Sequence, residues 1–235
     1  MQALTCVHRR AVLAFGPMES PSRDKILEAA ERVYAEHGFR GATTRRIAEA
    51  AGVNEVTLFR IFGGKEALLA AAIRPRAKRR DVVALPDEPV DPEREMTAWV
   101  AANLAFLRQR RSIIRKTMSE MEERPQFAAC VREGPQHARH ALKGYLAALA
   151  EGGWFEGEVD ERAAIAMLIG VIFSDAMGRE LMADHFPPLS AAPRSYARLF
   201  LRAIGLRSRP ARTAAKHATS TANGRRPPVR SSNSR

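Results

Sequence analysis

Basic and hydroxyl side chains are concentrated in the segment TTRRIAEAAGVNEVTLFRIFGGK, residues 43–65. The guanidinium groups of Arg45 and Arg60 can donate hydrogen bonds to phosphate oxygens, as can an ammonium group. The hydroxyl of Thr57 can donate to a phosphate or to a base edge, and Val56 can contact the methyl group of a thymine. These residue types at this spacing predict hydrogen bonding to duplex DNA rather than catalysis.

Two short helices must hold these side chains. Thr43 or Thr44 can cap the first and Asn54 can cap the second, because their side-chain oxygens accept from the free N–H groups of a first helical turn. Gly52 supplies the turn between the two helices. The apolar residues expected to face one another are Ile47, Ala48, Ala51, Leu58 and Phe62. The pattern predicts a helix-turn-helix that lies in a DNA groove.

Helical periodicity continues along nearly the whole chain, and strand signals are almost absent. One helix is predicted from Ser22 to Gly38 and another from Lys65 to about Pro75. Later helices are predicted over 93–110, 112–123, 125–150, 160–183 and 191–205. The fold class is therefore all-α, with an N-terminal three-helix helix-turn-helix domain and a larger helical domain.

Five regions are expected along the chain. They are an N-terminal extension over 1–21, a DNA-binding domain over 22–74, a connecting segment over 75–92, a helical domain over 93–206 and a disordered basic tail over 207–235. Met18 directly precedes the first regular pattern, so translation is expected to start there or the extension is disordered. The segment LPDEPVDPE, residues 85–93, contains three prolines and is typical of a linker.

Residues 26–69, ILEAAERVYAEHGFRGATTRRIAEAAGVNEVTLFRIFGGKEALL, resemble the TetR family of bacterial transcriptional regulators almost position by position. The resemblance implies that the helix over 54–60 is the recognition helix. It also implies that Thr44, Phe59 and Lys65 contact the DNA backbone. The full set of predicted DNA-binding residues is Thr44, Arg45, Arg46, Asn54, Glu55, Val56, Thr57, Phe59, Arg60 and Lys65.

Three positions depart from the family pattern. Phe59 stands where many members have Tyr, and Ile61 stands where many have His or Tyr, so two donors to phosphate are missing. Gly64 replaces the usual Ser or Asn cap of the following helix and caps less well. Backbone affinity is therefore expected to depend more on the remaining basic residues.

The resemblance further implies that the larger domain forms a homodimer and binds a small-molecule effector. Helix 160–183 is broadly apolar and interleaved with small residues, so pairs of helices from two subunits could form a four-helix interface. The predicted interface residues are Leu168, Val171, Ile172, Leu199 and Phe200. The same residues would also suit the core of a monomer.

Methionines and aromatic residues suggest an apolar effector pocket, because such side chains adapt to irregular ligands. The predicted pocket residues are Trp99, Phe106, Met118, Met121, Leu146 and Met167, with Leu107, Phe127 and Trp154 as further candidates. Each of them would equally suit an ordinary core.

Two polar groups in the larger domain are candidates for separate sites. Cys130, His137 and His140 could share a helix face that binds metal or acts as a thiol sensor. Gly134-Pro135 is expected to break that helix and no fourth ligand is evident, so no metal or cofactor is predicted. Glu120, Glu122 and Glu123 are expected to form a solvated acidic face.

The formal net charge is +12, from 38 basic and 26 acidic residues, and its location matters more than its total. Residues 207–235 carry eight basic residues and no acid. Such a tail could attract phosphate without sequence preference, or could merely keep the chain soluble. Two cysteines without disulfide or zinc spacing favour the reducing cytoplasm. No apolar run reaches the roughly 18 residues that span a bilayer, so no membrane partner is predicted.

The sequence therefore predicts a homodimeric, cytoplasmic bacterial regulator that binds a palindromic operator, most often as a repressor, and releases it when an effector binds. Two alternatives belong to other classes. An enzyme with an all-α active site would need a nucleophile–base pair or a metal site, and neither is found in the sequence. An architectural DNA-binding protein would bind duplexes without sequence preference and would sense no ligand.

Overall fold

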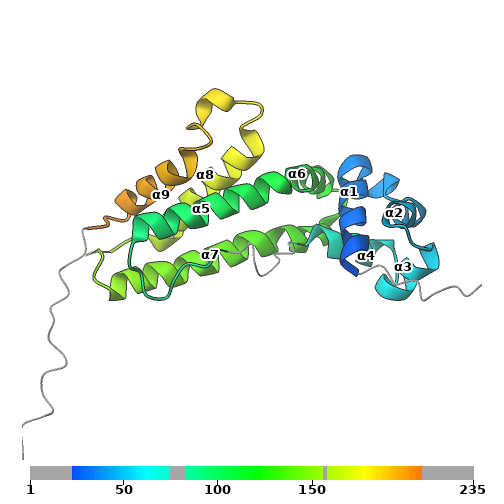
Figure 1. The fold of residues 1–235 in the computed structure, drawn as a ribbon, viewed down its shortest axis with the longest axis horizontal. Coiled ribbons are helices and arrows are strands. Elements are labelled where there is room, and N and C mark those ends of the chain that lie inside the picture. The colour runs from blue at the N-terminus through cyan, green and yellow to red at the C-terminus, as the bar shows by residue number, and fades with distance from the viewer. Residues whose placement is uncertain (1–22, 75–82, 156–157, 208–235) are drawn as a thin grey trace, which may run out of the picture.

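The computed structural model describes residues 23–74, 83–155 and 158–207, and these ranges contain helices and no strand (Figure 1). The α-helices are α1 (Arg23–Gly41), α2 (Thr44–Ala51), α3 (Glu55–Phe62), α4 (Lys65–Ile73), α5 (Pro92–Gln109), α6 (Arg111–Glu120), α7 (Ala128–Glu151), α8 (Glu161–Gly178) and α9 (Ala192–Ala203). Two short 3₁₀-helices, η1 (Pro125–Phe127) and η2 (Ala183–His185), lie in the connections. The all-α prediction is confirmed.

Helices α1 to α4 cluster at one end of the molecule, which we call the head (Figure 1). Helix α1 packs against both α2 and α4, and α3 packs between α2 and α4. The buried side chains that join them include Ile26, Leu27, Val33, Tyr34, Ile47, Leu58, Leu68 and Leu69. This burial supplies most of the stability of α2 and α3, because helices of eight residues are too short to be stable alone.

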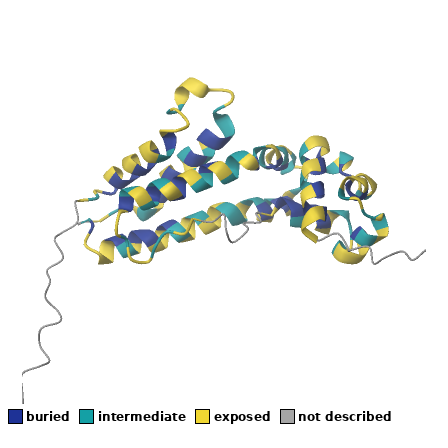
Figure 2. Ribbon diagram, viewed as in Figure 1, coloured by how far each residue is buried: buried dark blue, intermediate teal, exposed yellow. Residues whose placement is uncertain are grey.

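Helices α5, α7, α8 and α9 run lengthwise away from the head and enclose a second core (Figure 1). Helix α5 packs against α8 and α9, and α7 packs against α8. The largest side chains of this core are Trp99, Tyr145, Trp154, Tyr196 and Phe200. Buried residues line one side of α5, α8 and α9, whereas α7 has none between Cys130 and Leu142 (Figure 2).

The core of the head does not end at α4. Ile113 of α6, Phe127 of η1 and Cys130 of α7 are buried together with the side chains of α1 and α4. The predicted larger domain therefore contributes one helix and the start of another to the core of the head. Any movement of α6 acts directly on the head because the two share packed side chains.

Helix α7 corrects one prediction, because it runs unbroken through Gly134 and Pro135. A proline inside a helix removes one hydrogen bond and costs roughly 3 kcal/mol. Both ends of α7 are anchored, by Cys130 in the head core and by Leu142 in the bundle core. We infer that burial at the two ends outweighs the local cost.

Helix α8 ends at Gly178, five residues before the predicted end at residue 183. Beyond it the backbone N–H groups of Leu181 and Met182 both donate to the carbonyl of Gly178, so the chain turns there. The other predicted helices agree with the structure to within three residues. None of the described helices combines the length and apolar character needed to cross a bilayer. The predicted extension over 1–21 and residues 208–235 of the predicted tail lie outside the described residues.

Candidate nucleic-acid interface

The two short helices of the head are capped at both ends by local contacts. The Thr43 hydroxyl accepts from the N–H of Arg46 at 3.2 Å, and the Asn54 side chain accepts from the N–H of Val56 at 2.9 Å. Gly52 ends α2 in a left-handed conformation with φ of 69°, which favours glycine. The cap of α2 is thus Thr43, one of the two residues predicted for it.

One side of helix α3 is buried against the head and the other side is exposed to solvent (Figure 2). Leu58 is buried in the core of the head, whereas Val56 is 71% exposed and Phe59 and Arg60 are also exposed. Thr57 is half-buried at the edge of this surface. An exposed methyl group, an aromatic ring and a guanidinium on the first two turns suit a groove lined by bases and phosphates.

Thr44 and Glu55 join the beginnings of α2 and α3. The Thr44 hydroxyl donates to the carboxylate of Glu55, and both side chains are half-buried. The resemblance assigns Thr44 to a phosphate, whereas in this structure its hydroxyl donates to the carboxylate of Glu55. A contact with phosphate would therefore require the Thr44 side chain to adopt another rotamer or to give up its hydrogen bond to Glu55.

The two arginines of α2 differ in how firmly they are held. Arg45 pairs with Glu49 one turn later at 3.0 Å, but its side chain is largely exposed, so solvent screens the pair and Arg45 can exchange Glu49 for a phosphate. The guanidinium of Arg46 donates to the carbonyl of Gly41 at 2.7 Å. Arg46 therefore also ties α2 to the end of α1.

Lys65 lies against an aromatic ring rather than pointing freely outward. Its Nζ is 4.3 Å from the ring centroid of Phe39, and the guanidinium carbon of Arg124 lies 3.6 Å from the same centroid. Burial, and then the nearby charge of Arg124, lower the pKa of Lys65, although Glu120 acts in the opposite direction. Two cations therefore share one ring at the contact between α4 and the segment after α6.

Glu120 corrects the prediction of a solvated acidic face. Its carboxylate accepts from the Tyr34 hydroxyl at 3.0 Å and from the N–H of Phe39 at 3.1 Å. Helix α1 is kinked at Gly38, where φ is 64° and ψ is −173°, and this kink frees the N–H of Phe39. Glu122 and Glu123 are exposed as predicted. Gly38 was the sequence signal for a kink in α1. No nearby residue in the sequence identified Glu120 as the acceptor for the N–H of Phe39.

The predicted pocket residues are spread over several environments. Trp99 and Leu146 are buried in the bundle core, Met118 is exposed, and Met121 is half-buried. Phe106 and Leu107 line a cavity of about 80 Å³ between α4, α5, α6, α7 and α8. Met167 lines a more open groove of about 440 Å³ near the start of α8 and the end of α9.

The predicted interface residues also divide by exposure. Leu168, Ile172 and Phe200 are buried in the bundle core, Val171 is half-buried, and Leu199 is 62% exposed. Among the possible metal ligands, Cys130 is buried while His137 and His140 are exposed. Within the described ranges, no three His, Cys, Asp or Glu side chains gather in a group that could hold a metal ion.

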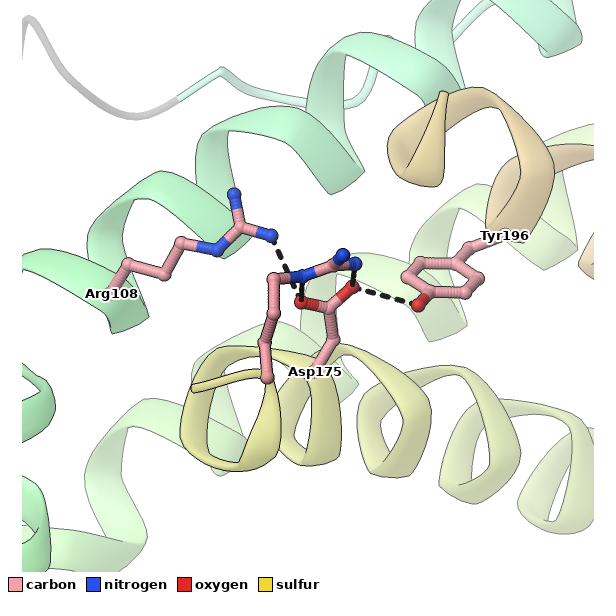
Figure 3. Close-up of polar contacts among 4 residues, drawn as sticks. Arg108, Asp175 and Tyr196 are labelled. Atoms are coloured by element: carbon pink, nitrogen blue, oxygen red, sulfur yellow. Dashed lines mark hydrogen bonds and ion pairs between the residues drawn. The ribbon is translucent and has the colours of Figure 1, made fainter. Parts of the chain in front are cut away.

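A buried carboxylate joins three helices of the bundle (Figure 3). Asp175 of α8 is 0% exposed and accepts from Arg108 of α5 at 2.9 Å and from the Tyr196 hydroxyl of α9 at 2.7 Å. Arg179 donates to both oxygens of the same carboxylate. Burial alone would raise the pKa of Asp175, but the hydrogen bonds from Arg179, Tyr196 and Arg108 outweigh it and lower the pKa to about 2.

This geometry defines a class of protein. Two capped helices expose donors and methyl groups on one surface, and a helix from a larger bundle is packed into the core behind them. That arrangement is a helix-turn-helix head attached to a helical bundle.

Comparison with known proteins identifies the family. The profile of the bacterial regulatory proteins of the tetR family matches residues 26–72. The uncharacterized regulator YvkB of Bacillus subtilis is 30% identical over 150 residues, which cover 63% of this chain and 79% of YvkB. The repressor AcnR of Corynebacterium glutamicum is 37% identical over 106 residues, which cover 43% of this chain and 56% of AcnR. This chain belongs to the TetR family.

Solved structures agree with the assignment. The fatty acid degradation regulator FadR from Bacillus halodurans superposes with a TM-score of 0.62 at 27% identity, over 78% of this chain and 96% of that one. FadR from Bacillus subtilis, determined in complex with stearoyl-CoA, has a TM-score of 0.58 at 20% identity, over 78% and 100%. The second likeness concerns the fold alone. The alignment with AcnR spans little more than half of that repressor.

Proposed function

We propose that this protein is a transcriptional repressor that binds a palindromic operator as a homodimer and responds to a small effector. The exposed outer face of α3 carries the proposal, because a capped helix with Val56, Phe59 and Arg60 facing solvent can enter a major groove. The likeness to the transcriptional repressor AcnR supports a role in repression. A protein of this kind works where the chromosome lies, in the cytoplasm.

The outer face of α8 supports the homodimer. Apart from Arg162 near its start, the exposed residues along it are Ala163, Ala166, Met167, Gly170 and Ser174, which carry no charge and are mostly small. Leu199 of α9 adds an exposed apolar side chain. Small residues let helices approach closely, and a contiguous apolar surface is costly to leave in water. Two such faces would place two α3 helices on one duplex, about 34–36 Å apart, and so select a palindrome.

Coupling between bundle and head supports the response to an effector. Helix α6 contributes Ile113 to the core of the head and Glu120 to the kink of α1. A ligand that favours a different position of α6 would change the spacing of the two recognition helices. The effector would then act by shifting the population of conformations rather than by covering the DNA-binding surface.

Selection of bound duplexes from a random pool tests the proposal. We expect an inverted repeat whose half-site centres are about one helical turn apart, or a multiple of it. Analytical ultracentrifugation of the complex should give two protomers for each repeat. A pool that yields no preferred sequence, with binding that depends on salt alone, would instead indicate an architectural DNA-binding protein.

A further inference from the structure

The connection between α6 and η1 carries a cation that has no acceptor for its donors among the described residues. The guanidinium carbon of Arg124 lies 3.6 Å from the centroid of the Phe39 ring, and the side chain is half-buried. Within residues 23–74, 83–155 and 158–207, its guanidinium forms no hydrogen bond and no ion pair, although Glu122 and Glu123 directly precede it in the sequence. A guanidinium has five N–H donors and no acceptor. The donors of Arg124 are therefore available to an anion from outside the chain.

The position of Arg124 is held by the segment that carries it. Its backbone N–H donates to the carbonyl of Glu120 at 2.9 Å, and its carbonyl accepts from the N–H of Phe127 at 3.1 Å. The same two residues hold the aromatic ring. The Glu120 carboxylate accepts from the N–H of Phe39 at 3.1 Å, and the ring centroids of Phe127 and Phe39 are 5.8 Å apart. The ring and the cation are therefore both attached to the end of α6.

Lys65 shares this ring and begins the helix that follows α3. Its Nζ lies 4.3 Å from the centroid of Phe39, and only two glycines separate Lys65 from α3. The hydrogen bond that Nζ donates to the carbonyl of Arg40 is long, at 3.5 Å. Burial, and then the charge of Arg124, lower the pKa of Lys65. Two adjacent cations repel each other, so a phosphate that lies next to them is attracted by both.

We propose that Arg124 pairs with an operator phosphate next to Lys65, so that the larger domain supplies a DNA contact of its own. This inference rests on the proposed function, because it extends the DNA-binding surface of the same regulator. A contact with phosphate positions the protein and carries no sequence information. Because Arg124 follows shortly after the end of α6, a displacement of α6 moves this contact as well as the head. Such a displacement would change the affinity for DNA of every sequence.

Titrations at several salt concentrations test this contact. We expect Arg124→Gln to weaken binding to a duplex selected from the random pool and to a scrambled duplex by a similar factor. The slope of log affinity against log salt should fall by about 1 for each protomer bound, because one phosphate contact is lost. Arg124→Lys keeps the charge and should retain the wild-type slope. Arg139→Gln is the matched control, because it removes the same charge from an exposed position on α7 and should leave the slope unchanged.

A role for Arg124 in packing alone predicts a different result. Loss of the stacking on Phe39 would lower the Tm of Arg124→Gln, measured by thermal unfolding without DNA. It would leave the salt slope unchanged, since that slope reflects the number of phosphates that the protein neutralises. If Arg124→Gln does not fold, Arg124→Met decides, because its apolar side chain keeps the contact with the ring and carries no charge.

Three outcomes would overturn the proposal. They are a wild-type slope in Arg124→Gln, an equally reduced slope in Arg124→Lys and Arg124→Gln, or a loss of affinity that is confined to the selected duplex. A wild-type protein that binds no duplex at low salt would refute the proposed function and this inference together. Intact binding by the wild type, with a slope that Arg60→Ala reduces and Arg124→Gln does not, would refute this inference alone.

Discussion

The carboxylate of Glu120 on α6 accepts a hydrogen bond from the hydroxyl of Tyr34 on α1, at 3.0 Å, across 86 positions of sequence. The same carboxylate accepts the N–H of Phe39, which the kink of α1 leaves without a helical partner. At the other end of α6, Arg110 holds α1 and α4. Helix α6 is thus fastened to the head at both ends, and its position and that of the head are coupled.

The first prediction concerns Glu120. Replacement by alanine leaves the Tyr34 hydroxyl and the Phe39 N–H without this acceptor in a partly buried site, so we expect a loss of about 1–3 kcal/mol in the free energy of unfolding. Urea unfolding followed by circular dichroism measures it. Glu122→Ala is the control, because Glu122 is exposed on the next turn and should change stability by less than about 0.5 kcal/mol. Equal effects of the two variants would contradict the role assigned to Glu120.

The second prediction concerns Gly38, which allows Glu120 to approach α1. Its φ of 64° is unfavourable for other residues, and a Cβ atom there would collide with the side chains of Glu120 and Lys116. Gly38→Ala should therefore destabilise the protein by about 1–3 kcal/mol. Gly144→Ala should have the opposite sign, since Gly144 is exposed inside α7 with open space around it, and should stabilise by up to about 1 kcal/mol. Thermal unfolding of the Gly38→Ala and Gly144→Ala variants measures both effects. A stabilised Gly38→Ala variant or a destabilised Gly144→Ala variant would contradict the prediction.

These contacts show which parts of the structure could be predicted from sequence. The caps at Thr43 and Asn54 were predictable because a cap involves residues only two or three positions apart. The partners of Glu120 were not, because its sequence neighbours Glu122 and Glu123 are indeed exposed and only the tertiary fold distinguishes the three. The residue type of Lys65 predicted a hydrogen-bond donor to phosphate. Its position against the Phe39 ring was not predictable, because it depends on how the segment after α6 packs.

Tertiary packing also explains why the predicted helix break at Pro135 was wrong, and why some predicted interface residues are buried while others are exposed. Local propensity disfavours a proline within a helix, but anchoring at both ends of α7 is a tertiary effect. Helical periodicity identified α8 as apolar on a wide surface. It could not separate Leu168, which faces the bundle core, from Met167, which faces solvent.

The third prediction concerns Asp175. Removing its charge by Asp175→Asn leaves Arg108 and Arg179 without their shared carboxylate, so we expect a loss of about 3–5 kcal/mol in the free energy of unfolding near neutral pH. The pKa of Asp175 is about 2 in the folded protein, below its usual ~3.9 in an unfolded chain. The charge therefore stabilises the fold fully above about pH 4, and this contribution is lost as the pH falls towards 2.

Urea unfolding of the wild-type protein and the Asp175→Asn variant at several pH values measures the contribution of the Asp175 charge to stability. The difference between wild type and variant should be constant at neutral pH and should shrink between about pH 4 and pH 2. Asp184→Asn serves as the control, since Asp184 is exposed in η2. A difference that stays constant down to pH 2 would show that the charge of Asp175 does not contribute as described.

The fourth prediction concerns self-association. Leu199→Asp places a charge on the exposed apolar face of α9, and burying it against a second copy should weaken the dimer by about 2–3 kcal/mol without unfolding the protomer. Light scattering after size-exclusion chromatography should then detect monomers at micromolar concentration. Leu181→Asp makes the same change at an exposed position beyond the end of α8, and this variant should remain dimeric. A wild-type protein that is itself monomeric would refute the proposed dimer.

The fifth prediction separates the reading of bases from the attraction to phosphate. Arg60→Ala should weaken binding to every duplex and reduce the slope of log affinity against log salt by about 1, because a phosphate contact carries no sequence information. Thr57→Ala should also change which bases are preferred, since Thr57 lies on the first turn of α3 at the edge of the exposed face. Titrations with operator and scrambled duplexes at several salt concentrations measure both effects. Arg139→Ala, an exposed change on α7 outside the head, should alter neither. If Arg60→Ala and Arg139→Ala behave alike, α3 does not enter the groove in the way proposed.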